Sequence, residues 1–187
     1  MVKINKIYTR TGDDGSTGLS DGSRAGKDCF RVRAYGEIDE ANSTIGVARL
    51  YMDNTELDRS LARIQNDMFD LGADLSTPEL ADDSLSLRIV QSQIDRLETE
   101  LDKLNEDLEP LKTFVLPGGS KPAAYLHLAR AVTRRAEREI VAMMRDETIN
   151  PLALKYTNRL SDYLFVAARW CNTQGTTDVK WVPGGER

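Results

Sequence analysis

Three arginines recur every four residues in HLARAVTRRAERE, residues 127–139. On a helix, Arg130, Arg134 and Arg138 share one face and form a ridge about 12 Å long at 1.5 Å per residue. Apolar residues of the same period are predicted to lie roughly opposite: Leu128, Val132, Ala136 and Ile140. Like charges one turn apart destabilise an isolated helix. The ridge therefore suits an extended polyanion such as a polyphosphate, although a solvated face neutralised by acids of other helices has the same pattern.

The segment TRTGDDGSTG, residues 9–18, suits phosphate binding. Its glycines allow close backbone approach, and a cradle of backbone N–H groups binds anions. The Walker A spacing is absent, and Gly/Thr-rich loops are also ordinary turns. Combined with the ridge, the loop predicts a nucleotide site. The glycines are Gly12, Gly15 and Gly18, the hydroxyls are those of Thr9, Thr11, Ser16 and Thr17, and Arg10 and Lys27 add positive charge.

Several single residues carry weaker signals. Asp39, on the first turns of a predicted helix, is either a helix-start acid or a partner for an arginine. Phe114 precedes a Pro-Gly-Gly turn and is either core edge or pocket wall. Asn158 and Asp162 lie one turn apart, where polar residues of a bundle can also satisfy each other. We interpret His127, the one histidine, as structural and not as a general base.

The charges of the chain are unevenly distributed. Its 187 residues carry a net charge of −5, which argues against general nucleic-acid binding. Residues 1–36 hold seven Lys and Arg against four Asp, and residues 121–145 hold six against two acids. Residues 37–120 hold seven against nineteen acids. Two basic segments in an acidic protein suggest one anion site assembled from both, with chance patchiness as the alternative.

Composition also excludes several classes. Two cysteines and one histidine are too few for a disulfide framework or a zinc site, so we assign no protein metal ligand. No apolar run is long enough to span a membrane, and the N-terminus does not read as a signal peptide. A cytoplasmic protein is expected.

Helical periodicity dominates after residue 37. The predicted helices span about 38–53, 56–75, 85–108, 121–145 and 151–172. The second has one apolar stripe: Leu57, Leu61, Ile64, Met68, Leu71 and Leu75. The third has another: Leu87, Val90, Ile94, Leu97, Leu101, Leu104 and Leu108. Ser120 and Asn150-Pro151 are start signals for the last two helices.

These elements predict an all-α fold, an antiparallel five-helix bundle with an ordered Gly/Thr-rich N-terminal loop. We expect a single domain over 1–187, with a nucleotide-binding loop region at 1–36, the bundle at 37–174 and a C-terminal tail at 175–187.

Five ordered motifs resemble a known family. They are TRTGDDGSTGL (9–19), YGEIDEANS (35–43), FVLPGG (114–119), HLARAVTRRAER (127–138) and NRLSDYLFVAAR (158–169), and the tail WVPGGER fits as well. Together they resemble the trimeric five-helix ATP:cob(I)alamin adenosyltransferases of bacterial propanediol use and mitochondrial cobalamin metabolism. The stretch 76–113 carries no family signature.

The resemblance implies the chemistry. Cobalt(I) of a reduced corrinoid attacks the 5′ carbon of ATP, and triphosphate leaves, giving adenosylcobalamin. Because Co(I) is itself the nucleophile, no Ser, Cys or His nucleophile is needed, and the protein supplies binding and electrostatics. The implied substrates are ATP and cob(I)alamin, with Mg²⁺ expected alongside arginines on the leaving group.

The resemblance also implies residue roles. Eight residues match the family's ATP loop: Thr9, Arg10, Thr11, Gly12, Asp13, Thr17, Gly18 and Lys27. Five more match its nucleotide-binding helices: Arg134, Arg135, Glu137, Arg138 and Asn158. Arg130 and Asp39 match a salt-bridged pair near the corrinoid. Phe114 matches the aromatic that closes the lower corrin face, excludes the axial ligand and leaves four-coordinate cobalt(II), which is easier to reduce.

The implied assembly is a homotrimer with ATP at subunit interfaces. A corrinoid reductase and an adenosylcobalamin-dependent acceptor enzyme are the implied partners, with no nucleic acid and no membrane. Three alternatives are a non-catalytic ATP- or corrinoid-binding or delivery protein, a structural trimeric bundle, and a phosphoryl-transfer enzyme. Triphosphate as by-product distinguishes adenosyl transfer from the last.

Overall fold

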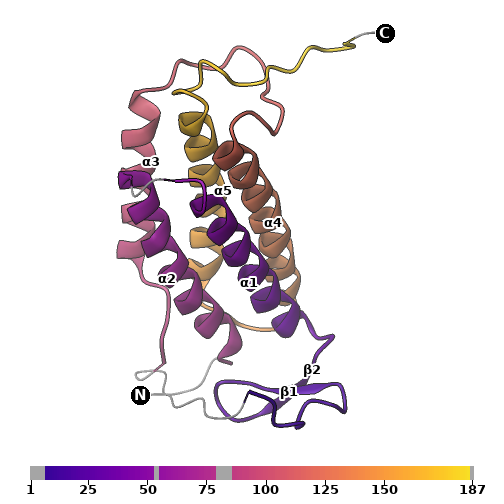
Figure 1. Ribbon diagram of the computed structural model, residues 1–187. Helices are drawn as coiled ribbons and strands as arrows, with labels where there is room; N and C mark the ends of the chain where they lie inside the picture. Colours follow the sequence, from indigo (N-terminus) through magenta and orange to yellow (C-terminus); the bar gives the residue numbers. More distant parts are fainter. Residues whose placement is uncertain (1–6, 53–54, 79–85, 186–187) are drawn as a thin grey trace.

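Five helices and one short hairpin make up the computed structural model, which describes residues 7–52, 55–78 and 86–185 (Figure 1). The helices are α1 (Phe30–Arg49), α2 (Glu56–Ser76), α3 (Gln91–Glu106), α4 (Lys121–Met143) and α5 (Pro151–Cys171). Successive helices run in opposite directions, and α1 packs against both α2 and α4, while α5 packs against α3 and α4. The predicted all-α antiparallel bundle is confirmed.

The apolar stripe of α2 forms one wall of the core. All six of its predicted residues are at most 4% exposed. Tyr156 and Tyr163 of α5 fill the centre and are fully buried. Since burial of one large apolar side chain contributes about 1.5–3 kcal/mol, these stripes, and not helix propensity, hold the bundle together.

Side-chain caps fix where three helices begin. Thr55 accepts a hydrogen bond from the Asp58 amide at 3.1 Å, and Ser120 accepts one from Ala123 at 3.3 Å. Asn150 accepts one from the Leu152 amide at 3.1 Å, and prolines stand in the first turn of α4 and of α5. The start signals predicted for the last two helices are confirmed.

The predicted start of the first helix was wrong. Helix α1 begins at Phe30, not at residue 38. Its N-cap, Cys29, makes no side-chain capping bond, and Arg31, 3% exposed, occupies a core-facing position where an apolar residue would be expected. Arg31 donates to the Leu75 carbonyl at 2.5 Å and pairs with Glu147. Because a charged residue occupies this buried position, the apolar periodicity that would have indicated the first turns of α1 is interrupted in the sequence.

The third helix also begins later than predicted, at Gln91. Leu87 and Val90 are 54% and 50% exposed, so they do not belong to the apolar stripe. The Asp74 carboxylate accepts from the Ile89 amide at 2.8 Å and from Arg88 at 2.9 Å, which holds this segment outside the helix. The predicted first residue, 85, lies outside the described residues.

On α4 one apolar assignment was wrong. Leu128 is 51% exposed, whereas Val132, Ala136 and Ile140 are at most 5% exposed. Toward the start of α4 the core stripe is instead continued by Ala129 and Leu126, which are both fully buried.

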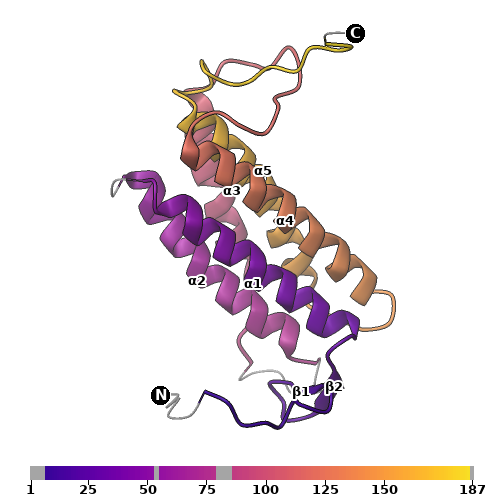
Figure 2. The ribbon, with the colours of Figure 1, turned by 45° about the vertical axis from the view of Figure 1, so that its right-hand side comes forward.

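The hairpin and the loop before α4 lie at opposite ends of the bundle. Strands β1 (Ser16–Gly18) and β2 (Arg24–Gly26) pair antiparallel below α1 in Figure 1. The loop 109–120 and the C-terminal residues 173–185 run together above the helices, as Figure 2 also shows. Among the described residues, no helix combines the length and apolar character that crossing a bilayer would require.

Candidate functional site

The N-terminal loop is held by its own hydrogen bonds. Arg24 donates to the Thr11 carbonyl at 2.5 Å and to Ser16 Oγ at 3.0 Å, and Lys27 Nζ donates to the Gly12 carbonyl at 2.8 Å. A Cβ at Gly12 would lie 3.0 Å from the Ser16 carbonyl and 3.1 Å from Lys27 Nζ. Glycine at this position therefore allows the close approach that shapes the loop.

The exposed part of the loop carries most of the predicted phosphate-binding groups. The hydroxyls of Thr9 and Thr11 lie 2.9 Å apart. Arg10 is exposed, stacks its guanidinium 5.6 Å above the Tyr8 ring and has a φ of 63°. Such left-handed backbone is unfavourable for a residue with a side chain and recurs at binding sites. Thr17, on β1, is half-buried.

No acid of the described residues forms an ion pair with the arginine ridge. None of Arg130, Arg134 and Arg138 forms an ion pair with a residue of the described ranges, and Arg138 donates only to the Arg134 carbonyl, at 2.9 Å. The described acids of the other helices therefore do not neutralise this face by direct ion pairs. An uncompensated row of cations attracts anions.

Arg130 is the most enclosed member of the ridge. Its Nε is buried and has no hydrogen-bond partner among the described residues. Burial, and then the nearby charge of Arg134, lower the pKa of Arg130. A buried donor without an acceptor is costly, so a group from outside this chain is the expected partner.

Two further predicted nucleotide-binding residues meet between α4 and α5. Asn158 donates to Glu137 at 2.9 Å. Arg135 instead lies on the α1 side of α4, where it pairs with Glu37 at 2.5 Å and also with Glu40. These two carboxylates raise the pKa of Arg135, Glu40 more than Glu37. The structure thus joins Glu137 and Asn158 but directs Arg135 away from them.

Asp39 lines a cleft of about 590 Å³ between α1 and α2. Gly18 of the hairpin lies at its edge, and the buried Asn42 Oδ1 in its wall has no hydrogen-bond partner among the described residues. No hydrogen bond or ion pair joins Asp39 to Arg130 in the described chain. The predicted salt bridge is thus not formed within one chain, because the two residues lie on faces directed toward different helices.

Sequence reasoning missed one feature of this cleft. Phe69 of α2 lines it and is 71% exposed. A signal was available, since Phe69 is a large aromatic one position outside the apolar stripe of α2. Phe69 adds an apolar surface to the wall of the cleft.

Phe114 stands out from the loop before α4. Its side chain is 76% exposed, so the interpretation as core is wrong and a pocket wall remains. The Trp181 amide donates to the Phe114 carbonyl at 2.9 Å, and the two rings lie 5.8 Å apart. The backbone is therefore held while the ring faces outward.

His127 is enclosed next to the ridge. It is 2% exposed, and its ring meets Phe165 edge-on at 6.0 Å. Neither ring nitrogen has a hydrogen-bond partner among the described residues. Burial and, less strongly, Arg130 lower the pKa of His127. A neutral packing role fits this environment.

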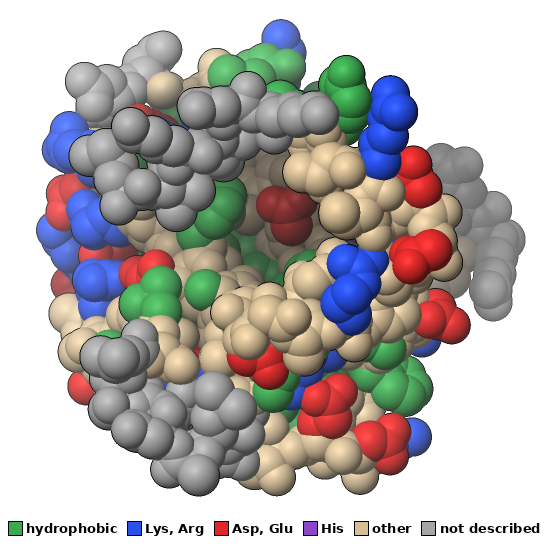
Figure 3. Space-filling view, turned by 90° about the horizontal axis from the view of Figure 1, so that it is seen from below, with side chains coloured by type: hydrophobic (Ala, Val, Ile, Leu, Met, Phe, Trp, Pro, Cys, Tyr) green, Lys and Arg blue, Asp and Glu red, His purple; other side chains and the backbone are tan. Residues whose placement is uncertain are grey.

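Among the described residues, no hydrogen bond or ion pair joins the two predicted halves of the nucleotide site, the loop 9–27 and the ridge on α4. Seen from below, the hairpin end of the molecule is hollowed, with hydrophobic and acidic side chains inside the hollow (Figure 3).

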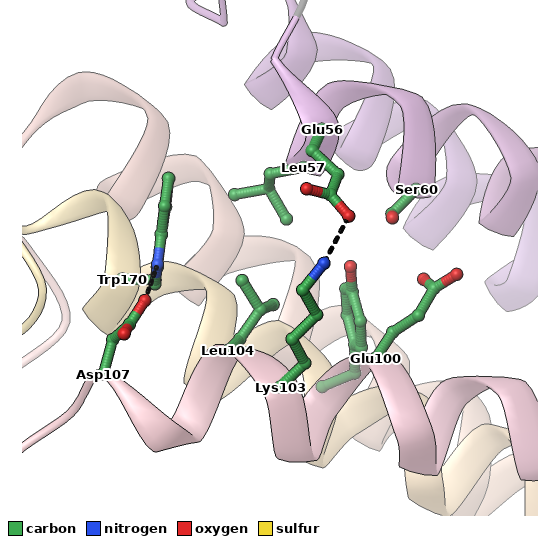
Figure 4. Close-up of a pocket in the computed structure, with 9 residues that line it drawn as sticks. Glu56, Leu57, Ser60, Glu100, Lys103, Leu104, Asp107 and Trp170 are labelled. Atoms are coloured by element: carbon green, nitrogen blue, oxygen red, sulfur yellow. Dashed lines mark hydrogen bonds and ion pairs between the residues drawn. The ribbon is translucent and has the colours of Figure 1, made fainter.

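A smaller hollow of about 140 Å³ lies between α2, α3 and α5 (Figure 4). Lys103 and Glu56 form an ion pair across it at 2.7 Å, and Trp170 lies at its side. None of the predicted site residues lines it. Among the described residues no group of three or more His, Cys, Asp and Glu side chains is placed to hold a metal ion.

Comparison with known proteins assigns the chain to a family. Residues 7–171 match the family model described as cobalamin adenosyltransferase. The corrinoid adenosyltransferase of Mycobacterium tuberculosis (strain H37Rv) is 52% identical over 190 residues, covering 100% of this chain and 97% of that protein. The corrinoid adenosyltransferase of Bacillus subtilis (strain 168) is 44% identical, covering 94% of this chain and 92% of that protein.

Solved structures agree with this assignment. A phenylalanine-to-alanine variant of the PduO-type ATP:corrinoid adenosyltransferase from Lactobacillus reuteri, complexed with cobalamin and ATP, superposes with a TM-score of 0.88. It is 40% identical, with 94% of this chain and 99% of that chain covered. An arginine-to-lysine variant of the same enzyme, complexed with ATP, has a TM-score of 0.86 and 41% identity, with 94% of this chain and 100% of that chain covered.

Proposed function

The chain belongs to the cobalamin adenosyltransferase family, and we propose that it moves the 5′-deoxyadenosyl group of ATP to the cobalt of cob(I)alamin at a site completed by a second copy of the chain. It is an enzyme of the ATP:corrinoid adenosyltransferase type. The catalytic function is favoured over the non-catalytic binding alternative, because the matched relatives are enzymes of this kind.

The reaction balances as one displacement. Cobalt(I) gives an electron pair to C5′ of ATP, a Co–C bond forms, the C5′–O bond breaks, and triphosphate leaves with the bonding electrons. The developing charge lies on the leaving oxygen and is spread along the phosphate chain. Fixed cations that need no reorganisation stabilise such a transition state. Arg134 and Arg138 are suited to this role because neither forms an ion pair with an acid of the described residues.

The unpaired ridge is the observation that carries the proposal. Arg135, on the same helix, has two carboxylate partners, so acids are within reach of α4. None of the described acids forms an ion pair with Arg130, Arg134 or Arg138. The remaining candidates, the loop residues 9–27 and Asp39, lie elsewhere on the chain. A neighbouring protomer could bring a loop to the ridge and Asp39 to Arg130. We therefore propose a homotrimer with ATP between protomers.

The spacing of two residues supports their proposed roles. The variants in the Lactobacillus reuteri structures replace a phenylalanine and an arginine that are 20 positions apart. Phe114 and Arg134 have the same separation here. We propose that Phe114 forms the lower wall of the corrinoid site and that Arg134 binds the triphosphate of ATP.

Mg²⁺ fits this site as a companion of the substrate. Mg²⁺ commonly binds through one or two carboxylates plus substrate phosphates, and the exposed Asp13 beside the loop glycines could supply one such ligand. When bound, the ion would neutralise part of the negative charge of the phosphates. The arginines orient the triphosphate of ATP and stabilise its negative charge as well.

The proposed setting is the cytoplasm. A reductase that delivers one electron to cob(II)alamin and an acceptor enzyme that uses adenosylcobalamin are the partners that this chemistry requires.

An anaerobic assay tests the function. The protein is mixed with ATP, Mg²⁺ and chemically reduced cob(I)alamin, and the Co(I) absorbance and the phosphate products are followed. We expect loss of Co(I) with one triphosphate per adenosylcobalamin. Orthophosphate or diphosphate as the primary product, or binding of ATP without loss of Co(I), would refute the proposal.

A further inference from the structure

Three buried polar side chains fasten the loop of Phe114 to the end of α5. We name Arg169, Asn172 and Asp178 the α5 clamp; they are 6%, 0% and 8% exposed. They lie at the end of the bundle where the loop 109–120 and the C-terminal residues run together (Figure 1). No predicted site residue belongs to the clamp.

Asn172 joins the turn before α4 to the C-terminal segment. Its Oδ1 accepts from the Ser120 amide at 2.9 Å, and its Nδ2 donates to the Gly118 carbonyl at 3.1 Å and to Asp178 Oδ1 at 3.2 Å. Since Ser120 is the N-cap of α4, Asn172 fixes the point at which the loop ends and the helix begins.

Arg169 joins the beginning of the same loop to the same carboxylate. Its Nε donates to Asp178 Oδ2 at 2.8 Å, and Nη2 donates to the Glu109 carbonyl at 2.9 Å. The Asp178 side chain is fully buried. A buried ion pair of this kind destabilises a fold strongly when one partner is removed.

Between these two anchors the loop pairs with the C-terminal segment. The Leu116 amide donates to the Val179 carbonyl at 2.7 Å, and Thr113 Oγ1 donates to the Trp181 carbonyl at 3.0 Å. With the bond from Trp181 to Phe114, this makes a short antiparallel bridge that starts one residue after Asp178. The position of Phe114 therefore depends on where Asp178 is held.

Gly119 shows how closely the clamp and the loop approach. Its φ is 102°, and a Cβ at this position would lie 2.2 Å from Asn172 Oδ1. The amide of Asn172 thus occupies the space that any side chain would need.

An exposed phenylalanine on a free loop would turn onto nearby apolar surface, because apolar burial is favourable. Phe114 remains 76% exposed on a loop that is fixed at both ends. We propose that the α5 clamp consists of positioning residues that hold Phe114 outward, ready to form the lower wall of the corrinoid site. This inference rests on the proposed function of Phe114.

The test compares Asp178→Asn with a matched control, Asp74→Asn. The Asp74 side chain is 1% exposed and accepts from Arg88, from Asn150 at 2.8 Å and from the Ile89 amide. Both variants remove one buried carboxylate charge beside an arginine and an asparagine, but Asp74 touches neither the loop nor the C-terminal segment. Arg169→Lys is a milder second variant, because lysine keeps the charge and loses the fork.

The first measurement is hydrogen exchange of the ligand-free protein. We expect peptides over 112–118 and 179–184 to exchange about tenfold faster in Asp178→Asn, and not in Asp74→Asn, because local opening follows the loss of anchoring contacts. Exchange as slow as in the wild type would overturn the proposal.

The second measurement separates reduction from transfer. With cob(II)alamin and a reductant, Asp178→Asn and, to a smaller extent, Arg169→Lys should lose about tenfold in rate, while cob(I)alamin supplied directly should restore the rate to within about twofold. The KM for ATP should not change. Equal losses from both starting states would refute a role through Phe114. A wild type inactive from both states would refute the proposed function instead, and the exchange result would still decide whether the clamp holds the loop.

Discussion

Arg134 lies exposed on α4, away from the core stripe, and has no acidic partner in the described ranges. Arg134→Ala should lower kcat/KM about a hundredfold or more, equivalent to about 3 kcal/mol, because the leaving triphosphate loses a fixed cation. The free energy of unfolding should stay within about 0.5 kcal/mol, as for other exposed positions. Steady-state kinetics and urea denaturation check both values.

Arg145→Ala is the matched control, since Arg145 is an exposed arginine just beyond α4 and should remain fully active. Arg134→Lys should also fail, because an ammonium group cannot reproduce the planar fork. A lysine variant with wild-type kinetics would mean that charge alone matters at this position.

Phe114→Ala should impair the reaction that starts from cob(II)alamin and leave ATP binding unchanged. Its ring is exposed, so the free energy of unfolding should change by about 1 kcal/mol or less, not by the 3–5 kcal/mol expected for a buried phenylalanine. The rate from cob(II)alamin should fall far more than the rate from cob(I)alamin, with unchanged ATP affinity. The electronic spectrum of bound cob(II)alamin provides the check: a complete four-coordinate signature in the variant would assign ligand displacement to another residue.

The turn before α4 depends on one glycine. Gly119→Ala should destabilise the fold by about 2 kcal/mol or more, because its φ is positive and the new Cβ would overlap Asn172. Gly118→Ala is the neighbouring control, since its Cβ would meet only Val179 at 3.9 Å. Urea denaturation of both variants gives the difference, and equal stabilities would show that Asn172 can move aside.

Helix prediction succeeded where an apolar stripe and a cap coincide. Ser120 and Asn150 mark the starts of α4 and α5, and the stripe of α2 is buried throughout. It failed where tertiary contacts replace local signals. Helix α1 begins at Phe30 without a side-chain cap and carries the buried Arg31 in its first turn. Asp74 holds Arg88 and Ile89 outside α3 through hydrogen bonds that no local pattern encodes.

The candidate site was predictable only in part. The spacing of the ridge follows from the sequence, but its lack of acids does not, since Glu137 and Glu139 lie beside it in the chain. Only the fold shows that they bind Asn158 and Arg33 instead. The α5 clamp escaped prediction because no sequence pattern shows that Arg169, Asn172 and Asp178 are buried together against the loop 109–120.

At the scale of the whole molecule, a site built from two protomers allows complementation. Lys27→Ala and Arg134→Ala damage different halves and should each be nearly inactive. Randomly mixed trimers should recover about a quarter of wild-type activity, because that share of interfaces combines two intact halves. The variants are unfolded, mixed and refolded, and sedimentation equilibrium verifies the trimer. Mixtures no more active than their parents would place the whole site in one chain.

The unpaired ridge has a consequence for how the reaction ends. Its arginines carry the same charge before and after the C5′–O bond breaks, so the contacts that stabilise the departing phosphates also retain them. Free triphosphate should therefore compete with ATP, and its dissociation should limit turnover at saturating substrate. Inhibition kinetics with added triphosphate, and a rapid first turnover followed by a slower steady rate, would reveal an enzyme whose pace is set by release of its by-product.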